Sequence, residues 1–200
     1  MNITRRLRDS IRTNLTLEDL LPTRMPVYVN SVAYLFGVAT LCCLGMLILT
    51  GIIMCVFGPG WYHLSRAGRF FNSLHYWGAQ GFFFFILVHL LTKFLLGAFR
   101  DGRWKTWMVG SATFGVAVFS GFTGFLSAST FSSQWHAVQG KDAMNAMGVG
   151  AFFVTTNFSQ VLTIHVLVLP ILVVILVSVH LLFIRHESPV KPYAEPGGRG

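Results

Sequence analysis

Long runs of apolar residues, separated by short polar stretches, dominate the sequence from about residue 31 onward. Four of these runs reach the length of about 20 residues that a helix needs to cross a bilayer. They cover about Ser31–Phe57, Phe71–Phe99, Trp107–Ser127 and Val161–Ile184, and Lys93 is the one charged residue inside them. Because the bilayer core offers no water to bond backbone groups, the runs predict four transmembrane helices.

Three further segments complete the expected architecture. Residues 1–30 are rich in arginine, with apolar residues at amphipathic spacing, and are expected to lie on the inner membrane surface. Aromatic and methionine residues between the third and fourth runs indicate one or two short surface helices. Residues 187–200 form a polar tail. The expected fold class is an all-α membrane protein in which residues 31–186 form a four-helix bundle.

Composition and charge narrow the class of protein. Apolar residues make up 54% of the chain and charged residues 11%, against about 25% charged residues in a soluble domain, which excludes a soluble enzyme. The net charge of +8 does not indicate nucleic acid, because the basic residues lie between the apolar runs. Eleven of them lie on the side of both termini and three on the other. The positive-inside rule therefore predicts a multi-pass protein of the cell (inner) membrane with cytoplasmic termini.

Four of the seven histidines lie inside the apolar runs. His75 and His89 are 14 residues apart in the second run, and His165 and His180 are 15 apart in the fourth. At about 100° per residue, these steps depart from whole turns by about 40° and 60°, so each pair stays on one helix face. The members of a pair are separated by about 21 Å. Since both helices run in the same direction, we expect His75 opposite His165 near the outer surface and His89 opposite His180 near the inner surface.

Each level thus offers two imidazoles without a carboxylate or thiolate beside them. Zinc prefers four compact ligands, whereas a haem brings four nitrogens and takes two axial histidines, which favours electron transfer. We therefore expect two haems, one with His75 and His165 on the outer iron and one with His89 and His180 on the inner iron. A histidine proton relay normally involves intramembrane carboxylates. All seven acidic residues lie outside the runs, so the sequence favours haem ligation over a relay.

Two glycine pairs repeat the histidine spacing. Gly37 and Gly51 in the first run, and Gly110 and Gly124 in the third, are each 14 residues apart. Small residues in membrane helices often serve close helix packing alone. Because the two pairs match the spacing of the histidines, we interpret them as bare helix surface that meets each haem edge.

From about Val27 onward the sequence resembles the N-terminal half of cytochrome b, and most closely the shorter cytochrome b6 type. The segments that carry the resemblance include NSLHYWGA, VHLLTKFLLGAF, TWMVG, GFTG and IHVLVLP…VHLLFIR. The resemblance implies two non-covalent b-type haems and, through them, electron transfer between quinol and quinone sites. The chain would act within a quinol:cytochrome c oxidoreductase of the bc or b6f type, as a subunit that is not catalytic alone. The resemblance also implies a separate subunit carrying the remaining helices, a Rieske iron–sulfur protein, a c-type cytochrome and a membrane quinone in a dimeric complex, and no nucleic acid.

Several positions depart from the family pattern. Tyr34 stands where cytochrome b6 has a cysteine that binds an additional c-type haem, so no covalent haem is expected there. Asn72 and Tyr76 replace the arginines that usually flank the first histidine. The stretch 124–130, GFLSAST, replaces a family segment that shapes the outer quinol pocket. This last departure keeps open a second function, a di-haem quinone-reactive anchor of another respiratory oxidoreductase. A proton-relay transporter or helical scaffold is a third.

Basic residues near the inner surface are candidate partners of haem propionates, or of a proton path associated with a quinone. Their alternative role is to anchor the helix ends at the membrane surface, as basic residues commonly do. They are Lys93, Arg100, Arg103 and Arg185.

Overall fold

The computed structural model describes residues 32–187, and every regular element in that range is helical. In chain order the elements are α3 (Val32–Leu64), α4 (Arg66–Leu95), α5 (Trp104–Ser127), α6 (Phe131–Ala146), α7 (Phe158–Thr163), the π-helical segment η2 (Ile164–Val168) and α8 (Leu169–His186). The predicted surface segment 1–30 and residues 188–200 of the predicted tail lie outside the described residues.

Four helical stretches are long and apolar enough to cross a membrane: α3, α4, α5 and the continuous stretch Phe158–His186 formed by α7, η2 and α8. The predicted all-α membrane fold with four spanning helices is confirmed. The junction of the first two helices differs from the prediction, because α3 continues past Phe57 after a bend at Gly58, whose φ is 75°. Helix α4 begins early because the Ser65 hydroxyl caps it by accepting a hydrogen bond from the Gly68 N–H at 2.8 Å.

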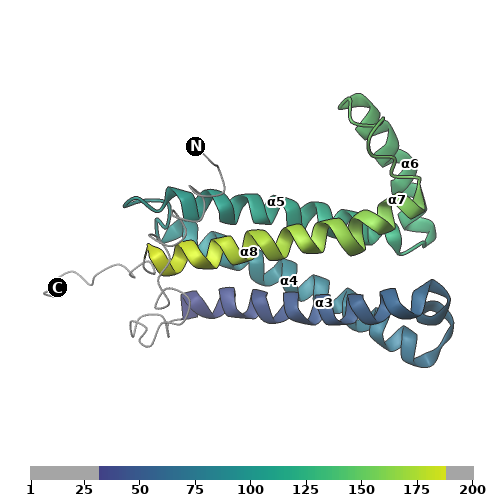
Figure 1. Ribbon diagram of the computed structural model, residues 1–200, viewed down its shortest axis with the longest axis horizontal. Coiled ribbons are helices and arrows are strands. Elements are labelled where there is room, and N and C mark those ends of the chain that lie inside the picture. The colour runs from purple at the N-terminus through teal and green to yellow at the C-terminus, as the bar shows by residue number, and fades with distance from the viewer. Residues whose placement is uncertain (1–31, 188–200) are drawn as a thin grey trace, which may run out of the picture.

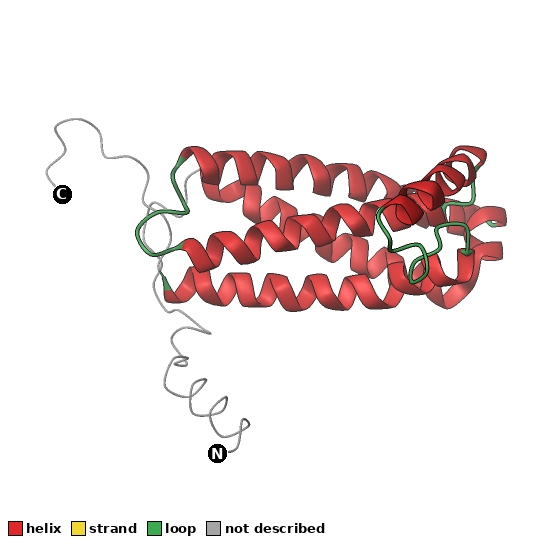
Figure 2. Cartoon of the chain, turned by 90° about the horizontal axis from the view of Figure 1, so that it is seen from above, coloured by secondary structure: helices red, strands yellow, loops and turns green. Residues whose placement is uncertain are grey.

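The spanning helices form two hairpins that lie side by side (Figures 1 and 2). Helix α3 packs along α4, and α5 packs along α8, whereas contacts between the two hairpins are sparse. Near mid-height, Phe82 and Ile86 of α4 meet Ala117 of α5 and join the hairpins. We call the two ends of the bundle the α6 end and the loop end, the latter carrying the loop between α4 and α5.

Many large apolar side chains face outward. Leu35, Leu49 and Val56 on α3, and Phe84 and Leu95 on α4, are all more than half exposed. On a soluble domain such a surface would promote association, but on a membrane protein it contacts lipid. The exposed apolar surface therefore agrees with an integral membrane protein.

Helix α6 leaves the end of the bundle at an angle to the spanning helices (Figure 1). The Thr130 hydroxyl caps its first turn. The Thr155 hydroxyl donates a hydrogen bond to the Ala137 carbonyl at 2.6 Å and fixes the helix to the following loop. Phe131 and Trp135 remain exposed. The helical segment expected between the third and fourth runs is therefore present.

Gly68→Ala is expected to destabilise the hairpin of α3 and α4. A Cβ at Gly68 would lie 2.1 Å from the carbonyl oxygen of Trp61, a backbone atom that cannot rotate away. Overpacking of this kind costs about 1–3 kcal/mol. Gly60→Ala is the control, because a Cβ at that position has no neighbour within 4 Å among the described residues. Thermal unfolding in detergent should give a lower midpoint for G68A than for G60A, and equal midpoints would contradict this packing.

Candidate functional site

Four histidines lie inside the bundle in two pairs. At the α6 end, the rings of His75 on α4 and His165 on η2 have centroids 6.4 Å apart and planes at 86°. At the loop end, His89 on α4 and His180 on α8 lie near each other, close enough for a charge on one ring to act on the other. The structure thus brings together the same two pairs that helical spacing predicts. The other histidines are exposed: His63, His136 and His186.

In the first hairpin, both imidazoles of α4 face a glycine of α3. A Cβ added at Gly51 would lie 3.4 Å from Cε1 of His75, which is ordinary contact. A Cβ added at Gly37 would lie 3.1 Å from both Cε1 and Nδ1 of His89, which is tighter than most real contacts. The bare surface of α3 therefore receives the two rings of α4.

The second hairpin repeats this arrangement with closer contacts. A Cβ at Gly124 would lie 2.7 Å from Cε1 of His165, and one at Gly110 would lie 2.8 Å from Cε1 of His180. A methyl group at either position would have to displace the imidazole. All four glycines selected by their spacing thus contact the imidazole rings themselves.

Hydrogen bonds at Nδ1 orient both rings at the α6 end. Thr50 donates its hydroxyl hydrogen to the Met46 carbonyl at 2.8 Å, so its oxygen accepts from the Nδ1–H of His75, also at 2.8 Å. The Nδ1–H of His165 donates to the Ser120 carbonyl at 3.1 Å. A neutral imidazole protonated at Nδ1 carries its free lone pair at Nε2, which leaves that atom available to a metal.

The two rings at the loop end differ from each other. The Nδ1–H of His180 donates to the Thr106 carbonyl at 3.1 Å. The hydroxyl of Thr106 donates to the carboxylate of Glu187, which ties the end of α8 to the start of α5. In contrast, Nδ1 of His89 is buried and has no hydrogen-bond partner within residues 32–187. Such unpaired buried groups are uncommon in folded proteins.

The oxygen partners of the rings are not among the residues predicted from the sequence, although two signals point to them. The dipeptide Thr-Gly occurs at both Thr50–Gly51 and Thr123–Gly124, and both threonine hydroxyls lie within 3.2 Å of an Nδ1 atom at the α6 end. Ser120 and Thr106, whose carbonyls accept from the rings, each stand four residues before a glycine that faces the same ring. The residues directly before such a glycine, and four residues before it, are therefore the positions that supply a hydroxyl or a carbonyl to the ring.

His165 lies in the π-helical turn η2, which ends just before Pro170. Proline has no N–H to donate to the preceding turn, and its ring crowds the carbonyl four residues earlier. A single wide turn relieves this conflict within an otherwise continuous helix. The π-helical turn thus stands where Pro170 would otherwise interrupt the hydrogen bonds of the helix.

The predicted basic residues lie at the loop end, but in different surroundings. The ammonium group of Lys93 lies 3.2 Å from the centroid of the Tyr34 ring. Arg103 is half-buried and pairs with the loop carboxylate of Asp101 at 3.5 Å. The other two are exposed: Arg100 and Arg185. Lys93 stands on α4 with His89, and Arg185 stands on α8 with His180.

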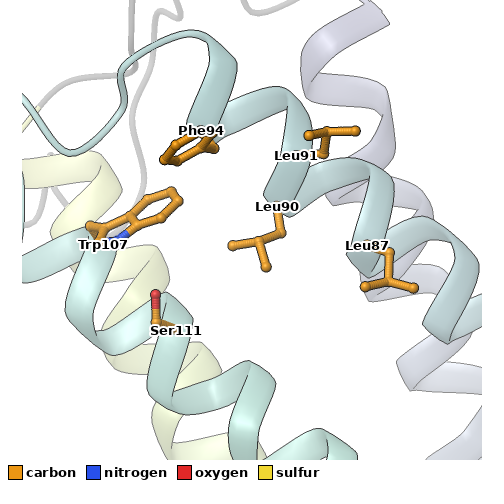
Figure 3. Close-up of a pocket in the computed structure, with 6 residues that line it drawn as sticks. All are labelled: Leu87, Leu90, Leu91, Phe94, Trp107 and Ser111. Atoms are coloured by element: carbon orange, nitrogen blue, oxygen red, sulfur yellow. The ribbon is translucent and has the colours of Figure 1, made fainter.

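An apolar cavity of about 460 Å³ opens between α4 and α5 toward the loop end. Figure 3 shows Leu90 and Trp107 facing each other across it. Leu90 directly follows His89, and Trp107 stands three residues before Gly110, so the cavity lies at the height of the loop-end pair. Its lining consists of Leu87, Leu90, Leu91, Phe94, Trp107 and Ser111.

The donor set fits a planar haem. No group of three His, Cys, Asp or Glu residues that could hold a metal ion occurs in the described part of the chain. Each level instead offers two imidazoles. A metal–imidazole bond is about 2 Å long, and centroids 6.4 Å apart leave room for one bridging metal whose other ligands the protein does not supply. The porphyrin nitrogens of a haem are such ligands.

Sequence comparisons agree with this geometry. The family described as Cytochrome b(N-terminal)/b6/petB matches residues 80–196. Cytochrome b6 of Heliomicrobium gestii is 25% identical over 197 residues, covering 88% of this chain and 92% of that protein. The cytochrome bc1 complex cytochrome b subunit of Mycobacterium tuberculosis is 30% identical over 147 residues, covering 66% of this chain and 26% of that protein.

The fold also resembles a solved structure, a chain of a hyperthermophilic respiratory Complex III. The TM-score is 0.72 at 18% identity, and the likeness covers 92% of this chain. This chain spans about half of that one, since the match covers 53% of it. Because the family match extends over more than half of the sequence, the chain belongs to the cytochrome b N-terminal/b6 family.

Proposed function

We propose that this chain transfers electrons across the membrane between quinol and quinone sites, as the cytochrome b subunit of a bc- or b6f-like quinol:cytochrome c oxidoreductase. The observation that supports this most directly is the pairing of imidazoles at two heights, each ring seated against a glycine. Residues 31–186 form the haem-bearing unit in this proposal, between a surface segment at 1–30 and a tail at 187–200.

Membership of the family implies haem binding, and two non-covalent b-type haems suit the two levels. The proposed iron ligands are His75 with His165, and His89 with His180, each through Nε2. When bound, each haem would supply a centre that accepts and releases one electron. The protein's part is to hold Nε2 unprotonated and correctly aimed, through hydrogen bonds at Nδ1 of His75, His165 and His180 and through the close approach of a glycine to every ring.

The mid-height contact of Phe82, Ile86 and Ala117 separates the two levels. The 14-residue step between the histidines of α4 corresponds to about 21 Å along the helix. Moving one charge through the membrane potential is worth about 2.3 kcal/mol per 100 mV. Electron transfer between the two levels would therefore contribute directly to the membrane potential.

The names of the relatives support membership of a multi-subunit complex. The proposed partners are a Rieske protein, a c-type cytochrome, a subunit with further cytochrome b helices and a membrane quinone, in a dimeric assembly. The loop end, and both termini with it, is proposed to face the cytoplasm. Arg100, Arg103 and Lys105 lie at this end, beside the start of α3 and the end of α8, and basic residues favour the cytoplasmic side.

Replacement of single ligands should remove single haems. In His75→Ala, the reduced-minus-oxidised spectrum of the purified full chain should retain about half of the b-type absorption, because the loop-end pair is intact. His89→Ala should lose the other half. His136→Ala is the control, since this exposed histidine lies on α6, and should keep the full signal. Two haems in H75A would contradict the pairing, and a wild-type protein without b-type absorption would contradict the function.

Gly124→Ala should lower haem content toward one per chain, because the new Cβ would lie 2.7 Å from Cε1 of His165 and turn this ring away. Gly115→Ala on the same helix is the matched control, since its Cβ finds no neighbour within 4 Å in the described structure. Haem per chain can be measured by pyridine haemochrome absorption. Equal haem content in the two variants would show that the close approach of His165 to Gly124 is not required for haem binding.

Thr50→Val should weaken retention of the haem at the α6 end, because the Nδ1–H of His75 loses its acceptor. Loss of such a partner typically reduces metal affinity by about 10–100-fold. Thr40→Val is the control, since the Thr40 hydroxyl donates to the Phe36 carbonyl of its own helix. The rate of haem transfer to an acceptor protein should rise in T50V, remain near wild type in T40V and be largely restored in Thr50→Ser.

A further inference from the structure

A cation–π contact joins α3 and α4 at the loop end. The Nζ of Lys93 lies 3.2 Å from the centroid of the Tyr34 ring. The same nitrogen is buried and has no hydrogen-bond partner in the range 32–187. A cation over an aromatic face is attracted by the ring quadrupole, and more strongly when both groups are shielded from water. The ring is therefore the group that the structure shows holding this ammonium.

The register of the two helices places this contact beside the histidine site. Lys93 follows His89 by four residues, about one turn, so the two side chains share a face of α4. Tyr34 precedes Gly37 by three residues and shares its face of α3. Since Gly37 faces His89, the Tyr34–Lys93 contact forms the next layer of the same helix interface. The ammonium of Lys93 is thus close enough to His89 for its charge to act on that ring.

An anchoring role at the membrane surface does not account for this conformation. A lysine that anchors a helix end extends its stem so that the ammonium reaches water. Here the ammonium is buried and turned onto the neighbouring helix. At the α6 end, the residue one turn after His75 is the uncharged Ala79, so the two levels differ in charge.

We propose that Lys93 is a fixed positive charge that raises the reduction potential of the haem held by His89 and His180, and that Tyr34 is the positioning residue that holds it there. The proposal rests on the proposed function. Reduction adds one electron to the haem, and a nearby cation stabilises the reduced form relative to the oxidised form. The proposed step adds one electron and moves no proton, so it requires only the electron donor and no further reactant.

The test is a redox titration of the full chain in two single-haem backgrounds. His75→Ala retains the loop-end haem, and His89→Ala retains the α6-end haem. Adding Lys93→Met to H75A should shift the one-electron equilibrium about tenfold toward the oxidised form, which is a fall of about 59 mV. The same substitution in H89A should leave the potential unchanged. Lys93→Arg keeps the charge and should restore most of the potential in H75A.

Substitutions at Tyr34 test the proposal independently, because they leave Lys93 in place. Tyr34→Leu in H75A should lower the potential by a smaller amount than K93M, because the ammonium loses the ring that fixes it, while Tyr34→Phe should match H75A. If K93M does not retain the haem, the comparison of Tyr34→Leu with Tyr34→Phe tests the proposal in its place. Unchanged potentials in K93M and Y34L, or equal shifts in both backgrounds, overturn the proposal. Absence of haem from the wild-type chain would instead overturn the proposed function.

Discussion

The close approach of an imidazole to a glycine backbone is the contact on which the rest of this bundle depends. It occurs four times, twice in each hairpin, and no side chain fits between ring and helix at Gly110 or Gly124 without displacement. Each contact seats an imidazole against a neighbouring helix, while the two hairpins touch each other only sparsely. The glycines therefore serve both helix packing and the orientation of the histidines, so the two explanations of their spacing are not exclusive.

The membrane environment explains why the Nδ1 atoms of the imidazole rings need hydrogen-bond partners within the protein. Inside a bilayer a polar atom finds no water, and a buried nitrogen without a partner is costly. At the α6 end, Thr50 and the Ser120 carbonyl meet this demand. At the loop end the Thr106 carbonyl serves His180, whereas His89 has a positive neighbour in Lys93. Two sites built on one plan thus differ in their electrostatic surroundings.

Much of this arrangement follows from spacing. The lengths of the apolar runs identify the four spanning helices, and the 14- and 15-residue steps place the histidines on one face at two heights. The boundaries near Ser65 were not predictable from hydropathy, because a helix cap is a local hydrogen bond between polar atoms. The hydrogen-bond partners of the rings were missed for a related reason: serine and threonine are common in membrane helices, and the carbonyl partners belong to the backbone, which every residue has.

By itself the sequence determined the number of spanning helices, the grouping of the four histidines and the glycines that match them. These features depend on the 3.6-residue periodicity of the helix and on the thickness of the bilayer, and both can be evaluated along a single helix. Only the tertiary structure decided what lies beside each ring, that His165 lies in a π-helical turn, and that Lys93 turns onto Tyr34. These features depend on the register and separation of helices from distant parts of the chain, where a shift of one residue replaces one neighbour with another.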